Sequence, residues 1–206
     1  MFFKNFMLVS IAALLIILGV MRVDSADNKN KTKNPRFEIT VTQKVTGKDG
    51  KLSDVSLGKI VIELYPEIAP KHVHNFDSLV AVKFYDGLAF HRVIPGFMIQ
   101  GGDPNSKDKP RELWGTGQAG QTRVPAEFNE LKHTRGVISM ARTNDPNSAT
   151  SQFFIMHADK THLDGQYSAF GKVVTGLEVV DKIAAAPRDK RDNPLDKIEM
   201  KIVKLK

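Results

Sequence analysis

The chain has 206 residues, of which 41% are hydrophobic and 26% are charged. This composition is typical of a globular protein and excludes a disordered or collagen-like chain. A chain of this length buries about 70% of the surface that its unfolded form exposes, so it needs no disulfide or metal to fold. The absence of cysteine excludes thiolate nucleophiles, cysteine-ligated zinc, iron–sulfur clusters and redox dithiols.

The formal charge of +7 raises the question of a nucleic-acid partner. Lysines and arginines are interleaved with acidic residues, however, through residues 44–54, 107–112 and 188–206. No basic stripe with interspersed aromatic residues occurs. The distribution predicts a mixed, solvated surface and no nucleic-acid partner.

The N-terminus carries a hydrophobic segment. Lys4 precedes an uncharged apolar run at residues 6–21, and Arg22 and a few small residues follow it. A basic start, an apolar run and small residues are the layout of a secretory signal. The run is shorter than the roughly 20 residues that a transmembrane helix needs. We interpret residues 1–26 as a signal peptide, with an uncleaved N-terminal membrane anchor as the alternative.

Both interpretations place the rest of the chain outside the cytoplasm. Residues 27–35 are polar and without periodicity, so they are predicted to form a tether, and residues 36–206 the folded domain. An exported chain without cysteine indicates a bacterial envelope protein more than a disulfide-rich eukaryotic one. The expected location is periplasmic or secreted, with anchoring to the inner membrane by residues 6–21 as the alternative.

The domain begins and ends with strand patterns. Apolar and polar residues alternate through residues 37–42 and 59–64, and the same period returns at 197–202. Glycines at residues 47–50 indicate a turn between the first two strands. Both ends of the domain are therefore predicted to be β.

Two segments have a helical period. The first begins near Pro70, and the second, residues 177–186, lies between Gly176 and Pro187. Five further short apolar segments read as strands: residues 89–94, 97–100, 137–141, 152–157 and 169–174. The sequence predicts a mainly β fold, a closed eight-stranded antiparallel β-barrel capped by two α-helices.

Several kinds of catalytic site are not supported. No Gly-x-Ser-x-Gly motif occurs, and Ser139 and Ser151 lie in predicted strands. His72 and His74 are two residues apart on a predicted helix, so they point in different directions and cannot share a metal. The glycine-rich residues 115–120 lack the Lys-Ser/Thr ending of a phosphate-binding loop, which favours a tight loop. We expect no metal and no cofactor.

One segment is unusual, residues 90–103, with the sequence Phe-His-Arg-Val-Ile-Pro-Gly-Phe-Met-Ile-Gln-Gly-Gly-Asp. If Arg92 and Gln100 lie on adjacent strands and face the same way, their donors meet above an apolar floor. The alternative from the pattern alone is an ordinary β-hairpin with a solvated arginine.

This segment resembles the cyclophilin signature at every fixed position. Three further blocks follow in the same order, at residues 136–143, 147–155 and 163–173. The resemblance covers about residues 37–203. The sequence of the middle blocks is similar to that of the bacterial cyclophilins. Cyclophilins are peptidyl-prolyl cis–trans isomerases built on an eight-stranded β-barrel with two capping helices.

The resemblance implies roles for individual residues. Arg92 would hold the prolyl carbonyl and donate toward the prolyl nitrogen of the twisted bond, and Gln100 would fix the substrate backbone. It further implies substrate-binding roles for His91, Phe97, Met98, Ala141, Gln152, Phe154, His162, Leu163 and Tyr167. The implied partner is a proline-containing polypeptide, the implied state is a monomer, and a membrane is touched only through an N-terminal anchor.

Some positions depart from the vertebrate pattern. His162 stands where many cyclophilins have Trp, and Tyr167 where they commonly have His, so we expect weak cyclosporin binding. Arg142 and Thr143 replace a common Asn-Ala, and the loop at 103–114 is unusually charged.

The predicted function is isomerisation of X-Pro bonds during folding of exported proteins. A catalytically idle peptide-binding or holdase domain on the same barrel is the alternative.

Overall fold

The computed structural model describes residues 33–206. Its longer strands form where apolar and polar residues alternate, as in residues 37–41. The predicted signal peptide or anchor lies outside the described residues, as does most of the tether. The elements, in chain order, are β1 (Arg36–Thr46), β2 (Leu52–Leu64), α1 (Pro70–Ala81), β3 (Phe90–Ile94), β4 (Met98–Gly101), β5 (Val137–Met140), β6 (Phe153–Met156), β7 (Ala169–Thr175), α2 (Leu177–Ala184) and β8 (Lys197–Lys204). No helix within residues 33–206 is long and apolar enough to cross a membrane.

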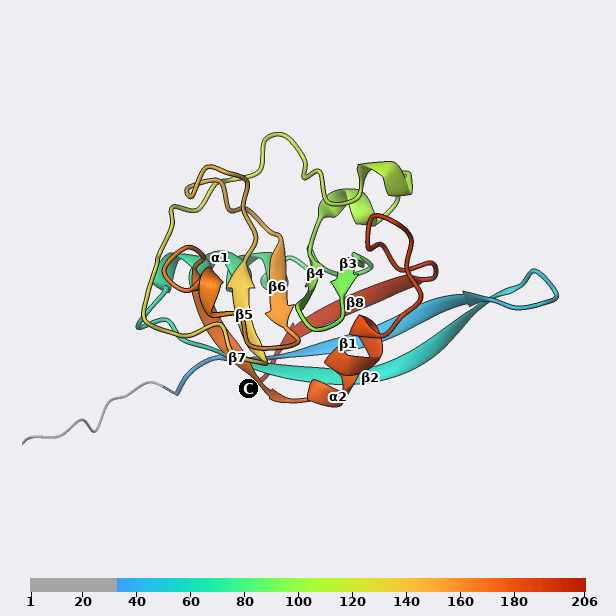
Figure 1. The fold of residues 1–206 in the computed structure, drawn as a ribbon, viewed down its shortest axis with the longest axis horizontal. Coiled ribbons are helices and arrows are strands. Elements are labelled where there is room, and N and C mark those ends of the chain that lie inside the picture. Colours follow the sequence, from blue (N-terminus) through green and yellow to red (C-terminus); the bar gives the residue numbers. More distant parts are fainter. Residues whose placement is uncertain (1–32) are drawn as a thin grey trace, which may run out of the picture. The chain divides into compact units, whose positions relative to one another are not determined.

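All eight strands belong to one antiparallel sheet in the order β3-β4-β6-β5-β7-β2-β1-β8. The sheet curls until its two edges meet just before β3 (Figure 1). There the Gly87 amide donates to the Met200 carbonyl, and the Met200 amide donates to the Leu88 carbonyl, each at 2.9 Å. Ala89 and Glu199 form a β-bridge beside these two hydrogen bonds. The predicted mainly β architecture with two helices is confirmed, and the sheet edges are joined by a short bridge.

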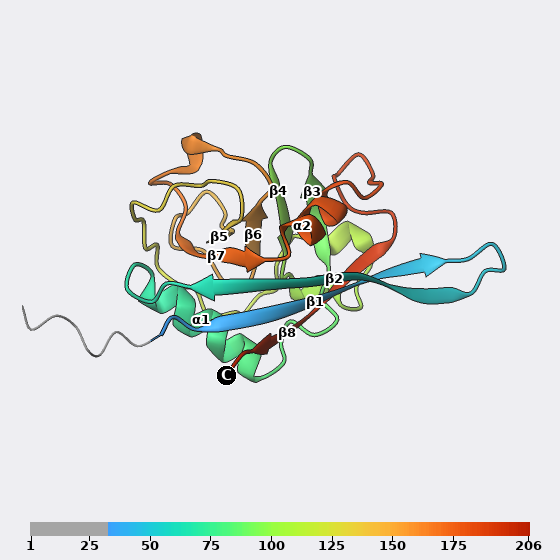
Figure 2. The same cartoon turned by 90° about the horizontal axis from the view of Figure 1, so that it is seen from below.

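The core lies inside the curl of the sheet. Phe37, Ile39 and Val41 of β1 are completely buried because they share the inward face of an alternating strand. Helix α1 buries Phe76 against this interior, where its ring lies edge-on to Phe37 with centroids 5.4 Å apart. Figure 2 shows α1 beside β1 and β8, and α2 on the other side of β2.

The strands β5 and β6 are buried on both faces. In β6, Phe153 and Ile155 belong to the interior core, whereas Phe154 and Met156 belong to a second apolar cluster on the outer face. Strand side chains alternate between faces, so this outer cluster requires its own cover. Long loops supply that cover, and the candidate site lies between them and the sheet.

The first hairpin is longer than predicted. The alternating pattern indicated strands at 37–42 and 59–64, but the pairing of β1 with β2 continues outward as far as Thr46 and Leu52. This hairpin projects away from the curled sheet (Figure 1). Most of its projecting residues are exposed, so there is no buried face to impose an apolar alternation that the sequence could reveal.

Candidate active site

A row of side chains crosses the outer face of four strands. Arg92 of β3 lies directly opposite Gln100 of β4, Gln100 lies opposite Phe154 of β6, and Phe154 lies opposite Ser139 of β5. Directly opposite residues of antiparallel strands share one face of the sheet. The predicted approach of Arg92 and Gln100 is therefore a consequence of strand register.

The polar half of this row is hydrogen-bonded from strand to loop. Arg92 Nη1 donates to Gln100 Oε1 at 3.4 Å, and Gln100 Nε2 donates to Gln152 Oε1 at 3.0 Å. Gln152 Nε2 in turn donates to the Gly115 carbonyl at 3.4 Å. Arg92 is exposed, and its guanidinium donates to the neutral Gln100 side chain. Its remaining N–H donors are therefore available to a ligand.

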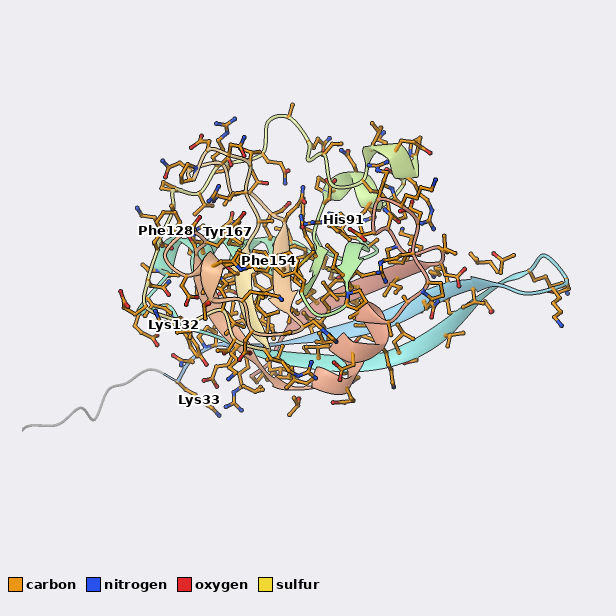
Figure 3. The ribbon with its side chains drawn as sticks, viewed as in Figure 1. Lys33, His91, Phe128, Lys132, Phe154 and Tyr167 are labelled. Carbon is orange, nitrogen blue, oxygen red and sulfur yellow. The ribbon has the colours of Figure 1, made fainter. Side chains whose placement is uncertain are left out.

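The apolar half forms a floor. Phe154, Met98 and Leu163 keep between 2% and 7% of their surface exposed and belong to the outer apolar cluster. Phe97, Ala141 and Tyr167 pack against this cluster. Figure 3 shows Phe154 in the middle of the sheet, with His91 and Tyr167 to either side. A concave apolar surface beside a cationic donor suits a small apolar ring next to a carbonyl.

Donors and floor enclose one cavity of about 410 Å³. Among the predicted site residues, all but Gln152 and His162 line it: His91, Arg92, Phe97, Met98, Gln100, Ala141, Phe154, Leu163 and Tyr167. Gln152 lines an adjoining cavity of about 340 Å³, which shares Gln100, Ala141 and Arg142 with the first. His162 is exposed, and its ring centroid lies 6.3 Å from that of Phe97, so it stands beside the first cavity without lining it.

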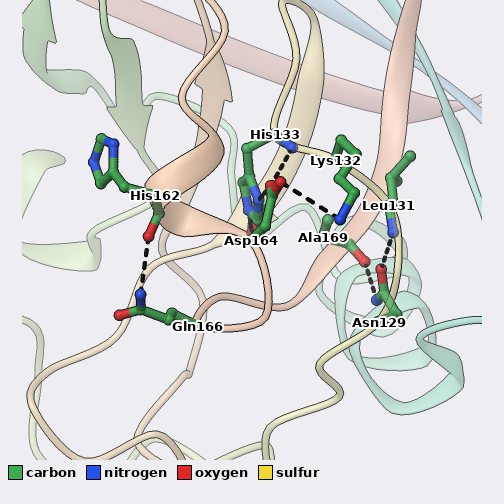
Figure 4. Close-up of polar contacts among 9 residues, drawn as sticks. Asn129, Leu131, Lys132, His133, His162, Asp164, Gln166 and Ala169 are labelled. Atoms are coloured by element: carbon green, nitrogen blue, oxygen red, sulfur yellow. Dashed lines mark hydrogen bonds and ion pairs between the residues drawn. The ribbon is translucent and has the colours of Figure 1, made fainter.

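A buried histidine supports the floor from below. The rings of His133 and Phe154 are stacked, with centroids 6.1 Å apart and planes 20° apart. His133 Nδ1 lies 3.1 Å from Asp164 Oδ1 (Figure 4). His133 Nε2 lies 3.1 Å from Ser139 Oγ. Burial lowers the pKa of His133, which favours the neutral ring with Nδ1–H facing Asp164 and Nε2 accepting from Ser139.

This Ser–His–Asp connectivity is not that of a hydrolase. Ser139 is completely buried and His133 is 1% exposed, so no substrate carbonyl reaches the hydroxyl. The Asp164 carboxylate also accepts the His133 backbone N–H at 2.8 Å. This bond joins the loop before β5 to the loop that carries Leu163. The three side chains fix the floor.

His91 sits at the rear of the cavity. It is 4% exposed, its ring nitrogens have no hydrogen-bond partner within the described residues, and burial lowers its pKa to about 4. It packs against Gly115, where an added Cβ would lie 3.2 Å from His91 Cδ2 and where φ is +89°. Position 115 therefore requires glycine both for its backbone conformation and for the space beside His91.

The sequence did not single out every residue around the cavity. Trp114, Gly115, Thr116, Arg142, Arg191 and Asn193 also line it. Arg111 joins two of their loops, donating from Nη1 to Asn193 Oδ1 at 2.8 Å and from Nη2 to the Leu195 carbonyl at 2.7 Å. The available signals were the charged composition of residues 103–114, the glycine-rich residues 115–120 and the replacement at Arg142. Arg191 and Asn193 had no signal, because contacts between distant loops leave no local pattern. Within residues 33–206, no three His, Asp or Glu side chains form a group that could hold a metal ion.

Comparisons with known proteins agree with this geometry. Residues 51–205 match the family model of the cyclophilin type peptidyl-prolyl cis-trans isomerases. The chain is 49% identical over 130 residues to a probable peptidyl-prolyl cis-trans isomerase of Brucella suis, a match that covers 61% of this chain and 66% of that protein. It is 44% identical over 155 residues to a peptidyl-prolyl cis-trans isomerase of Schizosaccharomyces pombe, covering 72% of this chain and 92% of that protein.

Solved structures give the same result. Two crystal structures of a Cryptosporidium parvum cyclophilin type peptidyl-prolyl cis-trans isomerase superpose with a TM-score of 0.66 at 32% and 33% identity. They cover 82% and 81% of this chain and 98% and 99% of theirs, and one was determined in the presence of the dipeptide Ala-Pro. With Arg92 and Gln100 of its signature segment on the outer face of the sheet and with residues 51–205 matched by the family model, the chain belongs to the cyclophilin type peptidyl-prolyl cis-trans isomerases.

Proposed function

We propose that this chain accelerates the isomerisation of X-Pro bonds in polypeptides that have been exported from the cytoplasm of a bacterium. The observation that carries the catalytic part is the placement of Arg92. Its guanidinium is exposed at the cavity, beside an apolar floor and opposite Gln100.

The reaction explains why such a simple site suffices. The planar amide resists rotation with a barrier of about 18–20 kcal/mol, because twisting removes its resonance. In the twisted state the prolyl nitrogen becomes pyramidal and can accept a hydrogen bond that it cannot accept in the planar state. A donor held at that nitrogen stabilises the transition state more than the ground state, which is the condition for catalysis. No covalent bond is made or broken, so neither a nucleophile nor a metal takes part.

The remaining residues would position the substrate. Met98, Phe154 and Leu163 would receive the proline ring, because they form the buried apolar floor beside Arg92. Gln100 would hold the substrate backbone while Gln152 and the Gly115 carbonyl keep its amide oriented. The Ala-Pro dipeptide present with the Cryptosporidium parvum relative has the chemistry that this floor requires.

A protease-coupled assay on a chromogenic proline peptide tests the catalytic part. The expected result is a first-order isomerisation rate that rises in proportion to the concentration of the protein. The contrary result is a protein that binds the peptide, as followed by titration, without changing the isomerisation rate. That outcome would identify a catalytically idle peptide-binding domain.

The export part rests on the sequence before the tether. Its basic start, apolar run at residues 6–21 and following small residues are the features of an export signal. Sequencing the N-terminus of the mature protein distinguishes cleavage near residues 25–26 from a retained anchor. Either result, combined with recovery in the periplasmic, secreted or membrane fraction, supports the proposal. Recovery of the full-length protein in the soluble cytoplasmic fraction contradicts it.

A further inference from the structure

The two adjoining cavities are lined by charges of one sign. Arg92 and Arg191 line the first, Arg123 lines the second, and Arg142 lines both. No Asp or Glu is among the residues that line either cavity in the described part of the chain. A groove with one sign of charge raises the local concentration of ligands of the opposite sign.

Arg142 is fixed without being neutralised. Its Nε and Nη2 donate to the Gln166 carbonyl at 3.1 and 2.9 Å, and its Nη1 donates to the Thr143 carbonyl at 2.9 Å. The guanidinium lies over the Tyr167 ring, 4.4 Å from its centroid. These contacts use only part of its fork of N–H donors, and no carboxylate within residues 33–206 lies within 4.0 Å of it. The side chain is therefore oriented in advance while its charge remains available.

Arg191 shares this property in part, and Arg123 does not. Arg191 Nη2 donates to the Glu112 carbonyl at 3.2 Å. Asp189 Oδ1 accepts the backbone N–H groups of Arg191 and Asn193, and the Arg191 charge helps to lower the pKa of Asp189 without a direct ion pair between the two side chains. Arg123 lies 3.6 Å from the Asp145 carboxylate, so its charge is already paired. Arg142 thus supplies the unpaired charge beside the Arg92 site, and Arg191 adds a charge that Asp189 partly offsets.

We propose that Arg142, supported by Arg191, makes this enzyme prefer X-Pro sequences with Asp or Glu in the residues next to the proline. The inference rests on the proposed isomerase function and adds a substrate class to it. Arg142 lies where the two cavities meet, so a chain that leaves the apolar floor toward the second cavity passes its guanidinium. A carboxylate there forms a charge-assisted hydrogen bond with a donor that loses little further freedom.

The test compares three peptides that differ only at the residue before proline, namely Glu, Gln and Lys. The Glu and Gln side chains have nearly the same shape, so their ratio of kcat/KM isolates the charge. We expect the Glu peptide to exceed the Gln peptide about fivefold at low salt, and the Lys peptide to be slowest. The ratio should fall as salt screens the interaction.

Three variants assign the preference to these residues. Arg142→Gln should remove most of the Glu/Gln ratio, Arg142→Lys should restore part of it, and Arg191→Gln should reduce it by a smaller factor. Lys201→Gln is the matched control, because it removes one positive charge from an exposed position on β8 that lines neither cavity. Its ratio should equal that of the unmodified protein.

The outcomes separate this inference from the function on which it rests. Equal turnover of the three peptides at low salt overturns the charge selection and leaves the isomerase function standing. A Glu preference that survives in the Arg142→Gln, Arg191→Gln double variant overturns the residue assignment. Turnover of none of the peptides contradicts the function, and titration of the Glu and Gln peptides then tests the charge selection on binding alone.

Discussion

The ring of Phe154 lies on the ring of His133, with 6.1 Å between centroids and 20° between planes. Phe154 forms the floor of the cavity, while His133 is buried and bound on both ring nitrogens, to Asp164 and Ser139. A buried side chain therefore sets the height and tilt of the apolar floor that we propose as the site of the proline ring. Asp164 follows Leu163 in the chain, so the same histidine also holds a second part of the floor.

Replacing His133 should cost both stability and activity. His133→Ala leaves a cavity below Phe154, removes the ring partner of the buried Ser139 hydroxyl and removes one contact of the partly exposed Asp164 carboxylate. Together these losses should lower the free energy of unfolding by about 2–4 kcal/mol. Urea denaturation measures this loss. The kcat/KM of the remaining folded protein should also fall, because Phe154 loses its support. His74→Ala on the exposed face of α1 is the control, and equal stability of the two variants would contradict the argument.

Acid should begin to destabilise the protein at a pH above the range in which carboxylates titrate. Burial lowers the pKa of His72 and His133 below the ordinary 6.5, and that of His91 to about 4. Because these pKa values are lower in the folded state, the unfolded chain takes up the protons first. The stabilisation is fully present above pH 6.5 and is lost as the pH falls toward 4. Each such group contributes a slope of about 1.4 kcal/mol per pH unit.

Urea denaturation at a series of pH values between 7.5 and 4.5 checks this slope. His72→Leu should reduce it, because His72 is completely buried, lies near Phe170 and has no side-chain hydrogen bond in the described structure. Glu127 and Lys71 are the charged neighbours that act on its pKa, and the replacement leaves both in place. A slope that stays unchanged in His72→Leu would show that His72 takes up its proton as readily in the folded protein as in the unfolded chain.

Arg92 should matter for the reaction and hardly at all for folding. Arg92→Ala should lower kcat/KM by about two orders of magnitude or more, equivalent to roughly 2.7 kcal/mol of transition-state stabilisation. The side chain is exposed and makes one long hydrogen bond to Gln100, so thermal stability should change little. Activity within threefold of the unmodified protein would refute the proposed role of Arg92.

The strands, the helices and the facing pair Arg92 and Gln100 were predictable, because each follows from a local pattern or from a motif within one hairpin. The extended β1–β2 hairpin was not, since its exposed residues carry no apolar alternation. The contributions of Trp114 and Arg191 to the cavity were not predictable either, because they lie on loops far apart in the sequence. Arg111 joins these two loops by its hydrogen bond to Asn193. The support of Phe154 by His133 likewise depends on pairing that no single segment encodes.

His162 offers a test of ligand preference. Its exposed ring stands near Phe97 without lining the cavity, so it contributes less apolar surface than the Trp of many cyclophilins. Cyclosporin should bind weakly to this protein, and His162→Trp should tighten binding by extending the apolar rim beside Phe97. Fluorescence or calorimetric titration of both proteins decides the matter. Equal affinities would show that another position limits binding.

The residues before β1 should be dispensable for catalysis up to a definite point. The Pro35 carbonyl accepts the Leu64 amide at 3.0 Å, and Arg36 forms an ion pair with Glu63 at 2.7 Å. Phe37, the next residue, is completely buried against Phe76. A chain that begins at Asp27 keeps all of these contacts, so its unfolding temperature and kcat/KM should match those of the full-length protein.

A chain that begins at Glu38 is the informative comparison. It lacks Phe37, whose removal from the core should cost about 3–5 kcal/mol, and it loses the bonds that Pro35 and Arg36 make to β2. Differential scanning calorimetry should show a large fall in unfolding temperature for this chain alone. If the chain from Asp27 folded normally but lost activity, residues before the barrel would take part in catalysis. If the chain from Glu38 kept full stability, β1 would not anchor the core through Phe37.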